Sequence, residues 1–268
     1  MFEADIATVL IVSLLVMVAL GVHIAVALGS TSALGIYLVT GGNFDIVLKM
    51  LASTAYESLR SYEFAVIPLF MLMGEFIGKS GAVTDVYRGI QRGLKRIPGR
   101  LALATLLGNA IFSFVTGVSI ASAAAFSRIA YPEMKRFGYD PGFALGSIAG
   151  SSCLGMLIPP SVMMIVWGLL TEQSIGQIFL AGVLPGLLLL SLFICYVLVM
   201  ALLRPDLVGE GSDKDLATLE PAEARPDVQA IQVWISALGI VLVVLTVLGG
   251  IWFGVFTPTE GAGVGAFI

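Results

Sequence analysis

Long apolar stretches alternate with short polar connections along this chain. A helix needs about 20 residues to cross a bilayer, and apolar segments of roughly that kind fall at 6–22, 24–40, 63–79, 101–127, 141–170, 177–203 and 230–256. Two other stretches, 45–60 and 80–100, place apolar residues at helical spacing beside charged ones. That spacing predicts helices that lie on the membrane surface. The pattern as a whole predicts an all-α integral membrane protein.

Composition supports the same conclusion. Of the 268 residues 58% are hydrophobic and 12% are charged, whereas a soluble domain carries about 25% charged residues. The net charge of −4 resides in the connections and gives no reason to expect a nucleic-acid partner. Cys153 and Cys195 both fall inside apolar segments, which favours two small buried hydrophobic residues over a disulfide. The lipid bilayer is therefore the first partner that the sequence predicts.

Positive charge is distributed unevenly along the chain. If the N-terminus lies outside, and segment 101–127 enters and leaves on one side, only Lys49 and Arg60 of the fourteen lysines and arginines lie outside. Cytoplasmic connections carry such an excess of Lys and Arg. The asymmetry predicts a multi-pass protein with a periplasmic N-terminus. It also predicts that 101–127 is a re-entrant hairpin opening from the cytoplasm.

Two short runs break the helical pattern inside apolar segments. Gly117-Val-Ser-Ile-Ala-Ser122 interrupts 101–127, and Gly155-Met-Leu-Ile-Pro-Pro-Ser161 interrupts 141–170. An unpaired backbone group in hydrocarbon costs several kcal/mol, and prolines 159 and 160 have no N–H to donate. Small residues at the first run also suit close helix packing. With the second break added, the pattern favours a site of the kind that discontinuous helices form in secondary transporters.

A weak internal similarity indicates a repeat. The run from Gly21 to Gly29 is similar to the run from Gly254 to Gly261, and five spans and the hairpin lie between their starts. An odd number of crossings inverts the second copy, as in many transporters. We therefore expect a first inverted repeat over 1–203, with its hairpin at 101–127 and its broken helix at 141–170. A cytoplasmic loop of seven acids and three bases follows over 204–228, and a second repeat begins over 229–268.

The run from Phe112 to Ser161, followed by Trp167-Gly168 and by SIGQIFLAGVLPG at 174–186, resembles the large membrane subunit of tripartite ATP-independent periplasmic (TRAP) transporters. The resemblance covers about the first three-fifths of a typical large subunit. It implies an inverted-repeat secondary transporter of the bacterial inner membrane that works by an elevator motion. The family imports a small organic anion by sodium symport, for example a C4-dicarboxylate or an acidic sugar such as sialic acid. A periplasmic substrate-binding protein and a small four-helix membrane subunit are the implied partners. We expect coupled uptake to need a completed second repeat.

The resemblance also implies where ions and substrate bind. Sodium is the implied coupling ion, with no organic cofactor, and its site is formed by Gly117, Ser119, Ser122, Gly155, Ile158, Pro160 and Ser161. Asn109, Ser122 and Ser161 are expected near the substrate. The family's hairpin tip often reads Ser-Gly-Ser-Ser, whereas this chain has Val118 in place of one serine. Any ion contact at that position is therefore expected from the backbone carbonyl.

Other functions fit the residues less well. An intramembrane protease built on Ser119 and His23 lacks the second glycine of the G-x-S-x-G motif, so we do not expect an enzyme. A passive channel or a structural membrane subunit remains an alternative, although a channel needs a continuous polar path and the polar residues here gather at one depth. The G-x-x-x-x-G-K-[ST] motif of ATP-binding proteins is absent from the sequence, which favours an ion gradient as the energy source.

The predicted orientation is testable by labelling. A cysteine introduced into 204–228 should resist an impermeant thiol reagent that is added to intact cells, because that loop is predicted to be cytoplasmic. Ready labelling from outside would reverse the whole topology.

Overall fold

The computed structural model describes residues 2–60, 62–209 and 226–268, and within these ranges every regular element is a helix. The predicted all-α fold is confirmed. The chain divides into two compact units, Met1–Phe64 and Ala65–Ile268.

The first unit consists of three helices, α1 (Phe2–Ala19), α2 (Ile24–Val39) and α3 (Phe44–Arg60), each of which contacts the next. A short 3₁₀ helix, η1 (Tyr62–Ala65), follows them. His23 lies in the turn between α1 and α2. Its Nδ1 accepts a hydrogen bond from the Ala25 N–H at 3.4 Å, so His23 caps α2.

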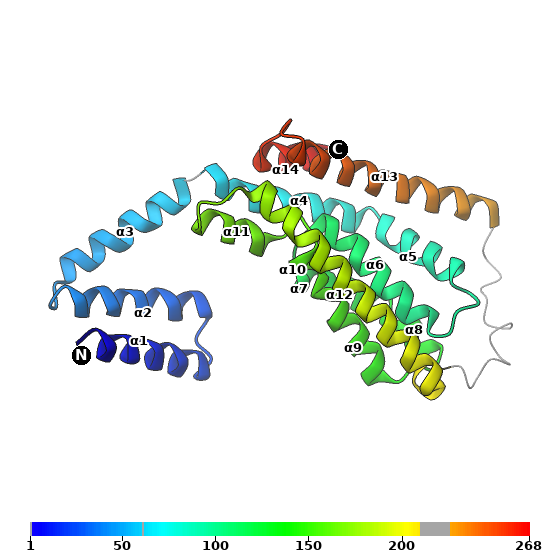
Figure 1. Ribbon diagram of the computed structural model, residues 1–268, viewed down its shortest axis with the longest axis horizontal. Coiled ribbons are helices and arrows are strands. Elements are labelled where there is room, and N and C mark those ends of the chain that lie inside the picture. The colour runs from blue at the N-terminus through cyan, green and yellow to red at the C-terminus, as the bar shows by residue number, and fades with distance from the viewer. Residues whose placement is uncertain (1, 61, 210–225) are drawn as a thin grey trace. The chain divides into compact units, whose positions relative to one another are not determined.

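The second unit is a bundle around one central helix (Figure 1). Its elements are α4 (Val66–Lys79), α5 (Ala82–Gly93), α6 (Arg100–Thr116), α7 (Ser119–Ile129), α8 (Tyr131–Arg136), α9 (Pro141–Ser152), α10 (Leu154–Leu157), α11 (Val162–Leu170), α12 (Ile175–Leu203), η2 (Pro205–Val208), α13 (Pro226–Trp252) and α14 (Pro258–Phe267). Helix α6 contacts α4, α5, α7, α9, α10 and α12, and most of its side chains are buried. The small and apolar residues of α6 permit this all-round burial.

Three stretches of the described chain are long and apolar enough to cross a membrane: 141–170, α12, and 231–252 within α13. Helices α4 and α5 together form a fourth candidate, bent by 60° at Ser80–Gly81. Helices α1, α2 and α6 are apolar but shorter than a full span. Large apolar side chains face outward on α12 and α13, among them Leu184 and Leu238. Such a surface fits lipid acyl chains.

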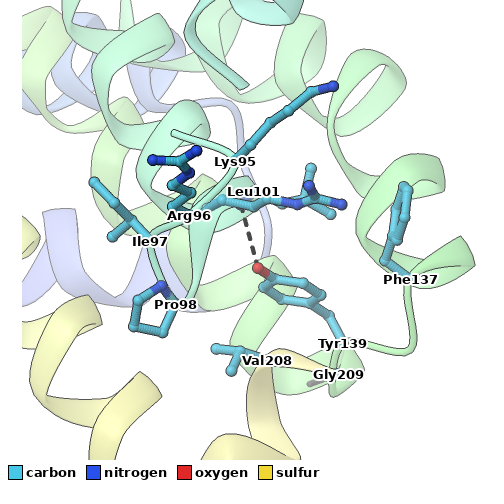
Figure 2. A pocket seen from close by; sticks show the side chains of 10 residues that line it. Lys95, Arg96, Ile97, Pro98, Leu101, Phe137, Tyr139, Val208 and Gly209 are labelled. Atoms are coloured by element: carbon cyan, nitrogen blue, oxygen red, sulfur yellow. Dashed lines mark hydrogen bonds between the residues drawn. The ribbon is translucent and has the colours of Figure 1, made fainter. Parts of the chain in front are cut away.

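The predicted hairpin segment 101–127 contains two helices joined by a break, and its entry into the membrane from the cytoplasmic side stays a prediction. Helix α6 ends at Thr116, α7 begins at Ser119, and α8, which follows α7, contacts α6. The Tyr139 hydroxyl accepts a hydrogen bond from the Leu101 N–H at 3.2 Å (Figure 2). This bond joins the start of α6 to the segment that follows α8. Phe126 of α7 packs against Tyr87 of α5 with ring centroids 6.1 Å apart.

Other sequence predictions have mixed outcomes. Both cysteines are free, but both are exposed, so the prediction of burial is wrong: an apolar helix in a membrane bundle can turn such residues outward. The predicted stripe in 80–100 is confirmed, since Val83, Val86 and Tyr87 are buried and α5 packs against α6 and α13. The placing of 80–100 and 45–60 at the membrane surface stays a prediction. So does the division into repeats, and most of the predicted loop 204–228 lies outside the described residues.

Candidate functional site

The first helix break separates α6 from α7. Gly117 adopts a left-handed conformation with φ of +60°, and its N–H still donates to the Ser113 carbonyl at 3.2 Å. Val118 is extended, with φ of −135° and ψ of 118°. Only glycine takes up a left-handed φ at low cost, so Gly117 allows the chain to reverse here. The Val118 carbonyl then accepts the Ser122 N–H at 3.2 Å and starts α7.

The second break separates α10 from α11. Ile158 and Ser161 are both extended, and the two prolines between them join through a cis peptide bond. A proline at 160 cannot donate to the carbonyl four residues earlier, that of Met156. The Ser161 hydroxyl donates to this carbonyl instead, at 2.8 Å. Ser161 thus stabilises one backbone group that the break sets free.

The two breaks lie against each other. The Val162 N–H, at the start of α11, donates to the Gly117 carbonyl at 3.2 Å. A Cβ atom at Gly117 would overlap the Pro160 carbonyl oxygen, and one at Gly155 would lie 3.2 Å from the Val118 carbonyl carbon. The sequence predicted both breaks, and the structure places them in direct contact. We call this contact the helix-break crossing: residues 116–119 and 122 with residues 155–162.

Oxygen atoms gather at the helix-break crossing. Within the described chain, the carbonyl oxygens of Ile158, Pro159 and Pro160 accept no hydrogen bond. The Ser122 hydroxyl lies 3.4 Å from the Thr116 hydroxyl, and both side chains are buried. The Ser119 side chain is half-buried at the first residue of α7. These groups are the unpaired carbonyls and hydroxyls that can replace the hydration shell of a small cation.

No carboxylate lies among the residues of the crossing, 116–119, 122 and 155–162. No group of three or more His, Cys, Asp or Glu side chains that could hold a metal ion occurs in the residues that the structure covers. Neutral oxygens at a helix break suit a weakly held monovalent ion better than a tightly held divalent one.

Thr116 is the residue that the sequence reasoning missed at this site. It ends α6, and its hydroxyl donates to the Phe112 carbonyl at 3.2 Å while facing Ser122. Its Cα also supports α4, because a Cβ at Gly74 would lie 3.0 Å from it. The available signal was the sequence Thr116-Gly117, a hydroxyl residue directly before a helix-ending glycine.

Asn109 lies away from the crossing. It is fully buried, eight residues or about 12 Å before Gly117 along α6. Its amide nitrogen donates to the Ser151 hydroxyl on α9, while its Oδ1 has no partner among the described residues. Asn109 therefore joins α6 to α9, and its place near substrate stays a prediction. Of the seven residues predicted to hold sodium, Ile158 packs its side chain against Gly186 of α12, so the predicted role falls to its backbone carbonyl and stays a prediction.

Comparison with known families decides what kind of protein carries this arrangement. Residues 11–268 match the model of the family described as "Tripartite ATP-independent periplasmic transporter, DctM component". The chain belongs to this family. The resemblance inferred from the sequence is thereby confirmed, and the family consists of transporter permease subunits rather than enzymes.

Curated relatives of this TRAP permease chain carry different substrate names. The C4-dicarboxylate TRAP transporter large permease protein DctM of Pseudomonas aeruginosa is 33% identical over 244 residues, which is 90% of this chain and 52% of that protein. The ectoine TRAP transporter large permease protein TeaC of Halomonas elongata is 27% identical over 95% of this chain and 56% of its own length. The sialic acid protein SiaM of Vibrio cholerae is 28% identical over 84% and 48%. The chain spans about half the length of these relatives.

The contact at the helix-break crossing predicts that an alanine substitution lowers the stability of the protein at one glycine of segment 141–170 and not at another. Gly155→Ala places a Cβ 3.2 Å from the backbone of Val118 and Ser119, which cannot yield as a side chain can. We expect a loss of about 1–3 kcal/mol in the free energy of unfolding. Gly146→Ala, in α9, meets nothing within 4 Å and should be neutral or stabilising by up to about 1 kcal/mol.

Unfolding of the purified protein in mixed micelles, titrated with sodium dodecyl sulfate, measures both changes. Equal stability of the two variants would show that the breaks are not packed as described.

Proposed function

We propose that this chain is part of the large membrane subunit of a sodium-coupled importer of a small organic anion, and that one sodium ion binds at the helix-break crossing. The observation that carries the proposal is the contact of two interrupted helices: the second break leaves three carbonyl oxygens without a hydrogen bond in the described chain, and the first break adds the hydroxyl oxygens of Thr116, Ser119 and Ser122. A bound cation satisfies these oxygens, which otherwise remain unpaired in hydrocarbon.

Ion binding at this point can be coupled to movement. The crossing joins the break between α6 and α7 to the start of α11 through the backbone hydrogen bond from Val162 to Gly117 and through close glycine contacts. A cation shared by both breaks binds better when they touch than when they separate. A gradient drives a conformational cycle only through such a difference in affinity between states.

The anionic substrate is proposed to bind beside the sodium ion. Helices α7 and α11 both begin at the crossing, so both direct the positive ends of their dipoles toward it. Half-helix N-termini that face an anionic group are a recurring feature of transporter sites. A carboxylate such as a C4-dicarboxylate or a sialic acid fits this polarity. Ser122 and Ser161 are the side chains that we place closest to it.

The partners follow from the family. We place the chain in the bacterial inner membrane, with a periplasmic binding protein that delivers the anion and a small four-helix subunit that supports the moving domain. The relatives named for C4-dicarboxylate, ectoine and sialic acid differ in solute, which fits a permease whose solute is selected by the binding protein.

A double substitution tests the sodium site. Ser119→Ala with Ser122→Ala removes two hydroxyls, and we expect the sodium concentration for half-maximal uptake to rise by more than about tenfold, since one contact to a charged group contributes about 1.5–3 kcal/mol and about 1.4 kcal/mol is a factor of ten. The assay is uptake of radiolabelled succinate, sialic acid and ectoine into vesicles that contain the assembled transporter. Ser127→Ala, on the exposed side of α7, is the matched control.

An unchanged sodium dependence in the double variant would overturn the assignment of these two hydroxyls. Uptake that needs no sodium gradient, and does not saturate, would instead favour the passive channel.

A further inference from the structure

Asn109 joins the two helices that lead into the two breaks. It lies in α6, and its amide nitrogen donates to the hydroxyl of Ser151 in α9. Helix α6 ends at the first break, at Gly117. Ser151 lies about one helical turn before Gly155, where α10 meets the backbone of the first break. The hydrogen bond between Asn109 and Ser151 therefore connects the helix that ends at one break to the helix that leads to the other.

Neighbouring hydroxyls on the same helices bond differently. Thr105 and Ser113 of α6, and Ser147 of α9, each donate to the carbonyl four residues earlier in their own helix, at 2.8, 2.6 and 2.8 Å. Such bonds satisfy a hydroxyl without depending on a second helix. The bond from Asn109 crosses to α9 instead. It forms only at one register, meaning one displacement of α6 along α9.

Stability alone does not account for an asparagine at this position. The Asn109 side chain is fully buried, and its Oδ1 accepts no hydrogen bond from the residues that the structure describes. An amide oxygen buried in this way destabilises the folded state. Ser151 does not need Asn109 either, because its hydroxyl already donates to the Ser147 carbonyl at 2.7 Å. A buried polar residue of this kind can fix how two helices align.

Helix α6 carries this register to the helix-break crossing. The Asn109 carbonyl accepts the Ser113 hydroxyl at 2.6 Å, and the Ser113 carbonyl accepts the Gly117 N–H at 3.2 Å. The Gly117 carbonyl in turn accepts the Val162 N–H at the start of α11. The backbones touch there, because a Cβ at Gly117 would overlap the Pro160 carbonyl oxygen. A displacement of α6 along α9 therefore disturbs a contact that has no spare room.

We propose that Asn109 is a positioning residue: through Ser151 it sets the register of α6 against α9 and thereby holds the two helix breaks in contact. The register does not depend on any ion. Its consequence for sodium affinity rests on the proposed function, because that consequence requires the ion to bind at the helix-break crossing. The test therefore measures the register and the sodium dependence separately.

Amide hydrogen exchange measures the register. The purified protein is compared with Asn109→Ala, Ser151→Ala and the double variant in potassium chloride without sodium. The reporter is the Val162 amide, because its hydrogen bond spans the crossing. We expect this amide to exchange about threefold to tenfold faster in each single variant, the factor that one hydrogen bond between membrane helices supports. The double variant should exchange no faster, since either substitution removes the same bond.

Ser147→Ala is the matched control. It removes a buried hydroxyl one turn earlier in α9, and that hydroxyl bonds only within its own helix. Exchange of Val162 in this variant should stay within about twofold of the unaltered protein. The amides of α12 are the internal reference, because a general loss of stability accelerates exchange there as well.

Uptake by the assembled transporter measures the consequence for sodium. Asn109→Ala and Ser151→Ala should each raise the sodium concentration for half-maximal uptake by about threefold to tenfold, and Ser147→Ala should leave it unchanged. Faster exchange at Val162 together with an unchanged sodium dependence would support the register and contradict the proposed ion site alone.

Three results would overturn the proposal. Unchanged exchange of the Val162 amide in Asn109→Ala would show that the breaks stay in contact without this hydrogen bond. Additive effects in the double variant would show that Asn109 and Ser151 act separately. Equal acceleration throughout α12 would reduce the effect to a general loss of stability.

Discussion

A helix that breaks inside hydrocarbon must find new partners for the backbone groups that the break sets free, and the arrangement of residues 65–268 depends on how two such breaks do so. Gly117 and Pro160 interrupt different helices, and each break supplies what the other lacks: an N–H from Val162 for the Gly117 carbonyl, and bare glycine surfaces that let the two backbones approach. Ser161 satisfies the Met156 carbonyl. The carbonyls left over are the ones available to an ion.

Helix α6 is the central helix of this unit. Its 17 residues extend about 25 Å, from Arg100 to the helix-break crossing at Gly117. Almost every side chain between them is buried, including Asn109, which bonds to Ser151 of α9. A shift of α6 therefore moves both of its ends together.

Much of this arrangement could be predicted from the sequence, and the limits have physical causes. Gly117 and the two prolines indicate helix breaks from the sequence alone. Glu75 and Lys79, one helical turn apart, form an ion pair at 3.0 Å, which their spacing favours. The contact between the breaks depends on tertiary packing across some 40 residues, which no local pattern encodes. The partner of Asn109, the role of Thr116 and the outward direction of Cys153 and Cys195 depend on packing in the same way.

The central claim is that one sodium ion binds to both breaks at once, and amide hydrogen exchange tests it most directly. The amides of Gly117 and Ser119 belong to one break, those of Ser161 and Val162 to the other, and Val162 bonds across the contact. Exchange measured in sodium chloride and in potassium chloride should be slower in sodium at both breaks together, with the amides of α13 unchanged. Sodium-dependent protection at one break alone, or at neither, would contradict a shared ion.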